Sequence, residues 1–305
     1  MLAGGVGAAR FLRGLSSLID PTSLTVIVNT GDDEVFHGLH VSPDVDTVLY
    51  TLAGLVATKQ GWGVNGDTFA CIDSLARYYD ETWFRLGDRD LATHILRTDL
   101  LRRGANLSTV TKRIRTALGI VSNILPMSDD RVRTFVDVEG QGALPFQQYL
   151  VRDRGLGVVR GIRLRGLRQA RPTPGVLGAI RGARVLILPP SNPFVSIEPI
   201  LGIRDVRTAV RHAAARCIAI SPIIGDAPVK GPLDRMLRGL GHEVSPVGVA
   251  RLYRGIASAF VLDRRDAALA PRIAELGMRP VITDTLMSSP AKSRRLAAAV
   301  LAAVD

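Results

Sequence analysis

The sequence has 305 residues, of which 47% are hydrophobic and 22% charged, so it can bury one large α/β core or a core with a smaller inserted domain, and a disordered chain is excluded. The formal net charge is +11, but the basic residues are spread along the chain without interleaved aromatic residues, so we expect no nucleic-acid binding. The sequence has no uninterrupted apolar run of about 18 residues, the length needed to cross a membrane, so we expect a cytoplasmic protein. Cys71 and Cys217 lie far apart and form no metal-spaced pair, so we expect two buried thiols.

Residues 2–18 predict the end of a strand, a glycine loop and a helix. The loop holds Gly4, Gly5 and Gly7, and apolar residues from 11 to 18 follow at helical spacing. Glycines before a helix let backbone N–H groups approach a phosphate at the positive end of the helix dipole. The loop is neither a full dinucleotide-binding fingerprint nor a Walker A loop, so a tight structural turn is the alternative.

A second strand is predicted at 24–28, and an acidic cluster follows it. Four aspartates lie within fifteen residues, accompanied by His37 and His40; they are Asp32, Asp33, Asp44 and Asp46. Hard oxygen ligands on a loop after a strand suit Mg²⁺ shared with substrate phosphates. Zinc is less favoured, because the cluster has two histidines and no cysteine. A solvated acidic loop is the alternative.

Opposite charges meet at 85–94, before a predicted helix. Arg85 and Arg89 could clamp a phosphate, and Asp90 could cap the helix or orient a partner. An ordinary ion pair at the start of a helix explains the same residues. The loops at 126–130 and 189–193 are rich in turn residues whose hydroxyl and amide groups could face a ligand.

Two later apolar runs, 184–188 and 217–220, predict buried strands that end in polar loops. Strands of this kind separated by helices predict a Rossmann-like, doubly wound, mainly parallel α/β sheet. Ligands of such sheets bind beyond the carboxyl ends of the strands.

The middle of the chain predicts a smaller inserted α+β region. Residues 107–118 predict a helix, and 133–138 and 147–151 predict short strands. We therefore predict a core made of 1–104 and 173–305, with 105–172 as an insertion or cap.

Taken in order, these segments resemble the 2-phospho-L-lactate transferase family. The likeness covers almost the whole chain. It is carried by the segments 4–7, 29–33, 42–50, 61–63, 86–90, 124–130, 190–193, 221–225 and 284–287.

The resemblance implies transfer of a phospholactyl group from lactyl-2-diphospho-5′-guanosine to the terminal ribityl hydroxyl of 7,8-didemethyl-8-hydroxy-5-deazariboflavin. GMP leaves, Mg²⁺ is required, and the product is coenzyme F420-0. Similar bacterial enzymes use the phosphoenolpyruvyl analogue of the donor and make dehydro-F420-0, and the motifs do not separate the two donors. We also expect a homodimer.

The matching motifs imply roles for particular residues. Asp46 is expected beside the acceptor hydroxyl and the metal, as base or ligand, and Arg85 at the deazaflavin. The other metal-facing residues are Asp32, Asp33 and Asp44. The donor is expected at the glycine loop and at Ser191, Asn192 and Pro193. Further substrate contacts are expected from Asn29, Thr30, His40, Ser42, Asp88 and Arg89. Ala8 departs from the family, in which many relatives have glycine.

Two rival functions remain open from the sequence. A non-catalytic regulator that binds nucleotide sugars would share the glycine loop and the sheet, although the segment 42–47 favours the transferase. An NAD-dependent oxidoreductase is less favoured, because the chain has no acidic residue about twenty positions after a complete glycine fingerprint.

Overall fold

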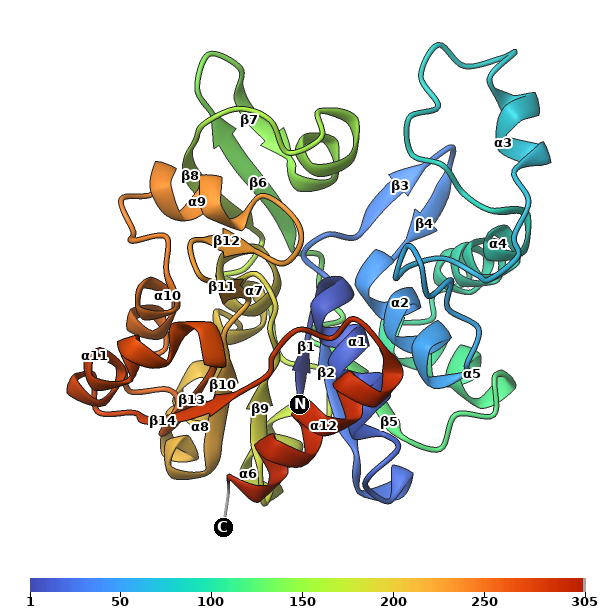
Figure 1. Cartoon of the computed structure of the whole chain (residues 1–305). Coiled ribbons are helices and arrows are strands. Elements are labelled where there is room, and N and C mark those ends of the chain that lie inside the picture. Colours follow the sequence, from blue (N-terminus) through green and yellow to red (C-terminus); the bar gives the residue numbers. More distant parts are fainter. Residues whose placement is uncertain (304–305) are drawn as a thin grey trace.

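The computed structural model describes residues 1–303, and two parallel sheets form its centre (Figure 1). The first sheet has the order β1-β2-β5, with β1 at Leu2–Ala3, β2 at Thr25–Val28 and β5 at Asn123–Pro126. The second has the order β14-β13-β10-β9, with β9 at Leu186–Leu188, β10 at Cys217–Ile220, β13 at Ala259–Asp263 and β14 at Arg279–Thr283. Since β1 contacts β9, the two sheets adjoin at the middle of the molecule. The predicted mainly parallel α/β sheet is confirmed.

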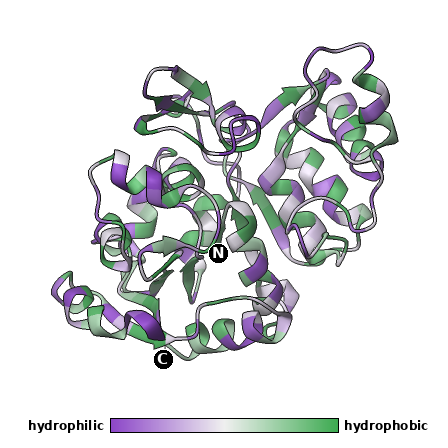
Figure 2. Cartoon of the chain, turned by 45° about the horizontal axis from the view of Figure 1, so that its top comes forward, coloured by the Kyte–Doolittle hydropathy of each residue, from purple (hydrophilic) through white to green (hydrophobic). Residues whose placement is uncertain are grey.

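Helices cover both faces of these sheets. Successive side chains of a strand point to opposite faces, so Leu186 and Leu188 pack in one apolar cluster and Ile187 in another. The first cluster is covered by α6 (Val176–Gly182), α7 (Glu198–Leu201), α8 (Val206–His212), α10 (Pro246–Leu252) and α11 (Ala270–Glu275). The second is covered by α1 (Gly5–Leu15), α2 (Pro43–Leu52), α4 (Asp88–Arg102), α5 (Leu107–Ala117) and α12 (Pro290–Ala302). The predicted doubly wound arrangement is therefore confirmed, and Figure 2 shows that hydrophilic and hydrophobic residues alternate along the helices of the chain.

A small antiparallel sheet stands apart from the central sheets. Its order is β7-β6-β8, with β6 at Arg133–Val138, β7 at Gly142–Pro145 and β8 at Val159–Arg165. It packs with α9 (Leu233–Gly239) around a third apolar cluster. The strand predicted at 147–151 is wrong: Gln148–Arg152 forms a π-helical turn that buries Tyr149. The division of the chain at 105 and 172 stays a prediction, and β5 from that range pairs with β2.

The remaining elements are short. They are the hairpins β3 (Glu34–Phe36) with β4 (Leu39–Val41) and β11 (Ile223–Ile224) with β12 (Ala227–Pro228), the helix α3 (Ala70–Leu75), the 3-10 turns Pro21–Ser23, Ala214–Arg216 and Arg264–Leu269, and the π turn Pro193–Ile197. Cys217 is buried as expected, but Cys71 is exposed on α3, because only Ile72 of that helix faces inward. No helix within 1–303 is long and apolar enough to span a membrane.

Candidate active site

A cavity of about 320 Å³ opens at the carboxyl ends of the central strands. Gly4 and Gly5 reach it after β1, Asp32 after β2, and Ser191 after β9. Ser221 and Thr285 line it after β10 and β14. This is the edge at which doubly wound sheets bind ligands.

The glycine turn is shaped first by backbone packing. A Cβ on Gly7 would lie 2.1 Å from the carbonyl oxygen of Pro190, and a Cβ on Gly4 would lie 2.6 Å from Cβ of Ser196. Gly5 has a φ of +71°, in the left-handed region that favours glycine. Close contact with the segment after β9 therefore explains Gly4 and Gly7 without a phosphate.

Asp44 joins this turn to the strand ends. Its Oδ1 accepts a hydrogen bond of 2.7 Å from the backbone N–H of Gly5. Its Oδ2 accepts one of 2.9 Å from Nδ2 of Asn29, which also donates to the carbonyl of Val195 at 3.2 Å. Asn29 is fully buried and does not line the cavity, so it positions Asp44 rather than touching a ligand.

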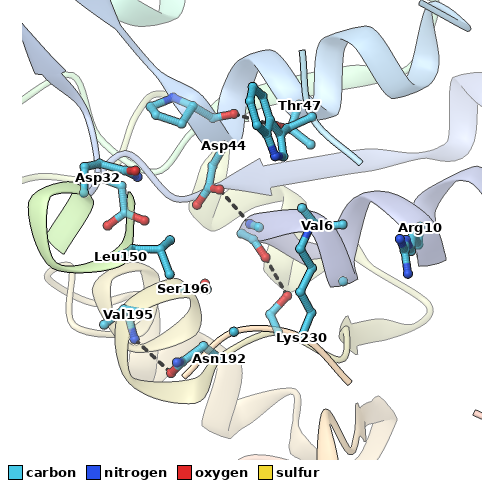
Figure 3. A pocket seen from close by; sticks show the side chains of 18 of the residues that line it. Val6, Arg10, Asp32, Asp44, Thr47, Leu150, Asn192, Val195, Ser196 and Lys230 are labelled. Atoms are coloured by element: carbon cyan, nitrogen blue, oxygen red, sulfur yellow. Dashed lines mark hydrogen bonds between the residues drawn. The ribbon is translucent and has the colours of Figure 1, made fainter. Parts of the chain in front are cut away.

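Two carboxylates face the cavity without enough positive charge around them (Figure 3). Burial and the nearby Asp44 raise the pKa of Asp32 well above its usual range, and Oδ1 of Asp32 is buried without a hydrogen-bond partner. Burial raises the pKa of Asp44 to about 6, although Asn29 and Gly5 donate to it. A bound cation would relieve this repulsion, so these two side chains fit a metal.

The other two predicted metal ligands, Asp33 and Asp46, are engaged by other side chains. Asp33 accepts a hydrogen bond of 2.6 Å from the hydroxyl of Ser42 and lines a separate cavity of about 290 Å³, together with Thr30 and His40. Asp46 lines the main cavity, but both of its oxygens are bound by the guanidinium of Arg97. Within 1–303 no group of three or more His, Cys, Asp or Glu side chains is arranged to hold a metal.

The expected placement of Asp44 and Asp46 on a loop is wrong. The helix α2 begins at Pro43, whose fixed φ suits a first helical position, so both aspartates lie in the first turn and are buried. Negative charge in a first helical turn is favourable because it faces the positive end of the helix dipole.

A buried polar network on α4 surrounds Asp46. Arg97 has no exposed surface, and its Nη1 lies 3.2 Å from Nδ1 of His94. A guanidinium can only donate, so Nδ1 accepts and the ring proton lies on Nε2, which is 3.2 Å from Oδ1 of Asp90. Asp90 also accepts a hydrogen bond of 2.6 Å from the hydroxyl of Tyr50 on α2.

The sequence-based interpretation did not identify His94 or Arg97. Asp90, His94 and Arg97 recur at spacings of four and three residues, which places them on one face of a helix. That polar stripe on the face turned toward α2 was the available signal. The network links α4 to α2 beside the cavity, through the contacts of Arg97 with Asp46 and of Tyr50 with Asp90.

The remaining predicted residues divide between the cavity and the surface. Arg85 lines the cavity, but its Nη2 pairs with exposed Asp73 at 2.7 Å. Asp88 accepts hydrogen bonds from the backbone N–H groups of Ala70 and Cys71, so it fixes the start of α3 outside the cavity. Arg89 lies outside as well, with Nη1 3.5 Å from the carbonyl of Asn65.

The segment after β9 supplies two lining residues. The hydroxyl of Ser191 donates to the carbonyl of Gly4 at 2.7 Å. Oδ1 of Asn192 accepts hydrogen bonds from the N–H of Phe194 at 3.0 Å and from the N–H of Val195 at 3.4 Å, and so caps the π turn that Pro193 begins. Figure 3 shows the bond from Val195. Ser191 and Asn192 line the cavity, and Pro193 does not.

Comparison with known proteins identifies the family. The model of the family described as 2-phospho-L-lactate transferase CofD matches residues 1–302. The chain belongs to this family of transferases. The segments that carried the resemblance in the sequence meet around the cavity at Gly4, Asp44, Trp62, Ser191 and Ser221.

Relatives in the 2-phospho-L-lactate transferase family carry two names. A phosphoenolpyruvate transferase of Streptomyces griseus is 45% identical over 92% of this chain and 89% of its own length. A 2-phospho-L-lactate transferase of Methanosarcina mazei is 39% identical over 99% of each chain. A crystal structure of a UPF0052 family member from Bacillus halodurans shares the fold, with a TM-score of 0.67 at 16% identity over 98% of this chain and 97% of its own.

Proposed function

We propose that this transferase moves the 2-phospho-L-lactyl group from lactyl-2-diphospho-5′-guanosine to the terminal ribityl hydroxyl of 7,8-didemethyl-8-hydroxy-5-deazariboflavin. The products are GMP and coenzyme F420-0. Membership of the 2-phospho-L-lactate transferase family over residues 1–302 carries the proposal. The reaction is consistent with a cavity that combines acidic, basic and aromatic side chains.

The alternative donor is the phosphoenolpyruvyl analogue, which would give dehydro-F420-0. One observation favours it: phosphoenolpyruvate transferases from two Streptomyces species are 45% and 44% identical to this chain, above the 39% of the Methanosarcina mazei relative. The acceptor hydroxyl and the leaving group are the same for both donors.

The transfer exchanges one phosphorus–oxygen bond for another. The acceptor oxygen forms a bond to the phosphorus that carries the three-carbon acid, and the bond from that phosphorus to the bridging oxygen breaks. The bridging oxygen leaves on GMP with the bonding electron pair, and the proton of the acceptor hydroxyl passes to the leaving phosphate or to water. Such displacements depend on alignment and charge neutralisation rather than on an enzyme nucleophile.

The side chains that face the cavity support defined roles in this reaction. Asp32 and Asp44 would hold Mg²⁺, which supplies positive charge to the diphosphate oxygens. Asp46 keeps acceptor lone pairs beyond those bound by Arg97, so it can accept a hydrogen bond from the acceptor hydroxyl and orient it. Because both carboxylate oxygens of Asp46 already contact Arg97, we assign it to orienting the hydroxyl.

Aromatic side chains make the cavity suitable for a planar acceptor. Trp62, Phe84 and Phe146 line it, and Phe84 is held by Phe36, whose ring stacks on it with centroids 3.9 Å apart. Planar rings bind favourably against such surfaces. Arg85, beside Phe84, pairs with exposed Asp73, and its Cζ lies 4.9 Å from the centre of the Phe69 ring.

Product mass tests the proposal. The protein is incubated with Mg²⁺, the deazaflavin and each donor separately, and we expect F420-0 from one donor or dehydro-F420-0 from the other. Titration with UDP-sugars in the same buffer tests the regulator alternative. Tight binding of UDP-sugars with neither product formed would reject the transferase and favour the regulator. The expected homodimer is tested by light scattering of the same preparation.

A further inference from the structure

Two basic side chains in the cavity have no acidic partner. Arg10 on α1 and Lys230 on the loop between β12 and α9 both line the cavity, and neither is within ion-pair distance of a carboxylate in residues 1–303. Nζ of Lys230 donates a hydrogen bond of 2.7 Å to the backbone carbonyl of Gln60. Both positive charges therefore remain uncompensated.

The side chains of Arg10 and Lys230 lie in the same region of the cavity. Val6 and Arg10 are four residues apart on α1, so their side chains share a helix face, and the backbone at Gly61 packs against Val6. Burial and the charge of Arg10 lower the pKa of Lys230, as expected where two like charges approach each other. Like charges held together in a cavity are stabilised most simply by an anion.

The charges in the cavity are segregated. Figure 3 shows Asp32 on one side of the pocket and Arg10 on the other, with Asp44 and the first turn of α1 between them. Asp32 and Asp44 make the first side suitable for a cation, whereas Arg10 and Lys230 make the second suitable for an anion. A diphosphate with one metal-bound end fits across this gradient of charge.

We propose that Arg10 and Lys230 bind the guanosine-bearing phosphate of the donor, the group that leaves as GMP. This inference rests on the proposed function, because it takes its ligand from the diphosphate-linked donor. Lys230 exchanges the carbonyl of Gln60 for a phosphate oxygen, so its ammonium keeps a hydrogen-bond partner in both states. As the bond to the bridging oxygen breaks, negative charge grows on the leaving phosphate, and fixed cations stabilise it.

Two matched pairs of variants of the full chain test the assignment. Lys230→Met is compared with Lys59→Met, and Arg10→Met with Arg113→Met; Lys59 and Arg113 are exposed and do not line the cavity. We expect Lys230→Met and Arg10→Met each to raise the KM for the donor about tenfold or more, a typical loss for a hydrogen bond to a charged group. The KM for the deazaflavin should stay within about twofold, and the control variants should match the unmodified protein on both measures.

Binding of inorganic pyrophosphate, measured by calorimetry with Mg²⁺ present, separates this inference from the proposed function. Weaker pyrophosphate binding in Lys230→Met and Arg10→Met, but not in the controls, supports the anion site even if neither donor is turned over. Equal binding in all five proteins overturns it. An equal loss in the control variants also overturns it, because it reflects net charge alone. Thermal melts verify that each variant is folded.

Discussion

Arg97 has no exposed surface, yet its guanidinium carries a full charge that Asp46 neutralises with both carboxylate oxygens. The pair joins α4 to the first turn of α2 below the cavity. Removing one member of a buried ion pair is costly because the other charge is left without compensation. Any experiment on Asp46 therefore probes the fold as well as the reaction.

We expect Asp46→Asn to lower the free energy of unfolding by about 3 kcal/mol, because the charge of Arg97 loses its partner inside the protein. Turnover should fall about 10²-fold or more at saturating substrates, because the carboxylate no longer orients the acceptor hydroxyl. Urea unfolding and initial rates measure the two effects separately.

The double variant Asp46→Asn/Arg97→Met is the control for this prediction. It removes both charges, so its loss of stability should be smaller than the sum of the two single losses. Stability unchanged in Asp46→Asn would contradict the coupling. A wild-type turnover rate in the single variant Asp46→Asn would show that Asp46 has no role in the reaction.

The sequence pointed to Asp32, Asp44 and Asp46, but it did not identify Arg97 or show how the polar residues pair. Asp46 and Arg97 are 51 positions apart, and nothing local to either residue identifies the other. Local sequence also could not show that the four aspartates of the acidic cluster face different cavities. Asp32 and Asp33 are adjacent in the chain, yet Asp32 lines the main cavity and Asp33 lines the other one. Adjacent side chains point in different directions where the backbone turns after β2.

At the level of elements, α1 and α12 cross so closely that their contact requires a glycine. A Cβ on Gly14 would lie 2.3 Å from the backbone carbonyl carbon and oxygen of Ser293. Both helices belong to the same apolar cluster, through Phe11 and Leu15 on α1 and Leu296 on α12. The position of the glycine turn at the start of α1 therefore depends on the C-terminal helix.

We expect Gly14→Ala to destabilise the protein by about 1–3 kcal/mol, because the added methyl group meets backbone that cannot move without separating the helices. Gly178→Ala on α6 is the matched control, since no heavy atom within 4 Å meets its Cβ. That variant should gain up to about 1 kcal/mol from the better helix propensity of alanine. Denaturant midpoints compare the two, and equal effects would contradict the close-crossing explanation.

Most strands and helices were predictable because their apolar residues recur at regular spacing. Residues 107–118 and 133–138 illustrate this, since α5 and β6 occupy almost the same ranges. The strand predicted at 147–151 failed because its apolar run is only three residues long, 149–151, and so short a run fits a strand or a buried turn equally well. Its outcome was decided by Tyr149, which packs into the third apolar cluster and donates to the carbonyl of Gly155 at 2.9 Å.

For the whole molecule, the cavity lies where the two parallel sheets adjoin, and its acidic side needs a counter-charge. We expect Mg²⁺ to be required for turnover and to raise the melting temperature. At about 100 times its Kd a ligand adds roughly 2.7 kcal/mol, which corresponds to about 5 °C for a chain of this size. Differential scanning fluorimetry with Mg²⁺ and with EDTA measures the shift without any substrate.

Two neighbouring aspartates supply the control. Asp32→Asn should abolish the Mg²⁺-dependent shift, because Asp32 faces the cavity, and Asp33→Asn should retain it, because Asp33 lines the other cavity. Full turnover in metal-free buffer, or a shift lost equally in both variants, would contradict the assignment of the metal to Asp32 and Asp44.

The hydrogen bond from Ser191 to Gly4 links residues 187 positions apart. On a ribosome that adds about 5–20 residues per second, the glycine turn waits roughly 10–40 s for its partner segment. During that time β1 has no β9 beside it, and its open edge can pair with other chains. The yield of native protein should therefore depend on the speed of translation and on chaperones that shield the first hundred residues.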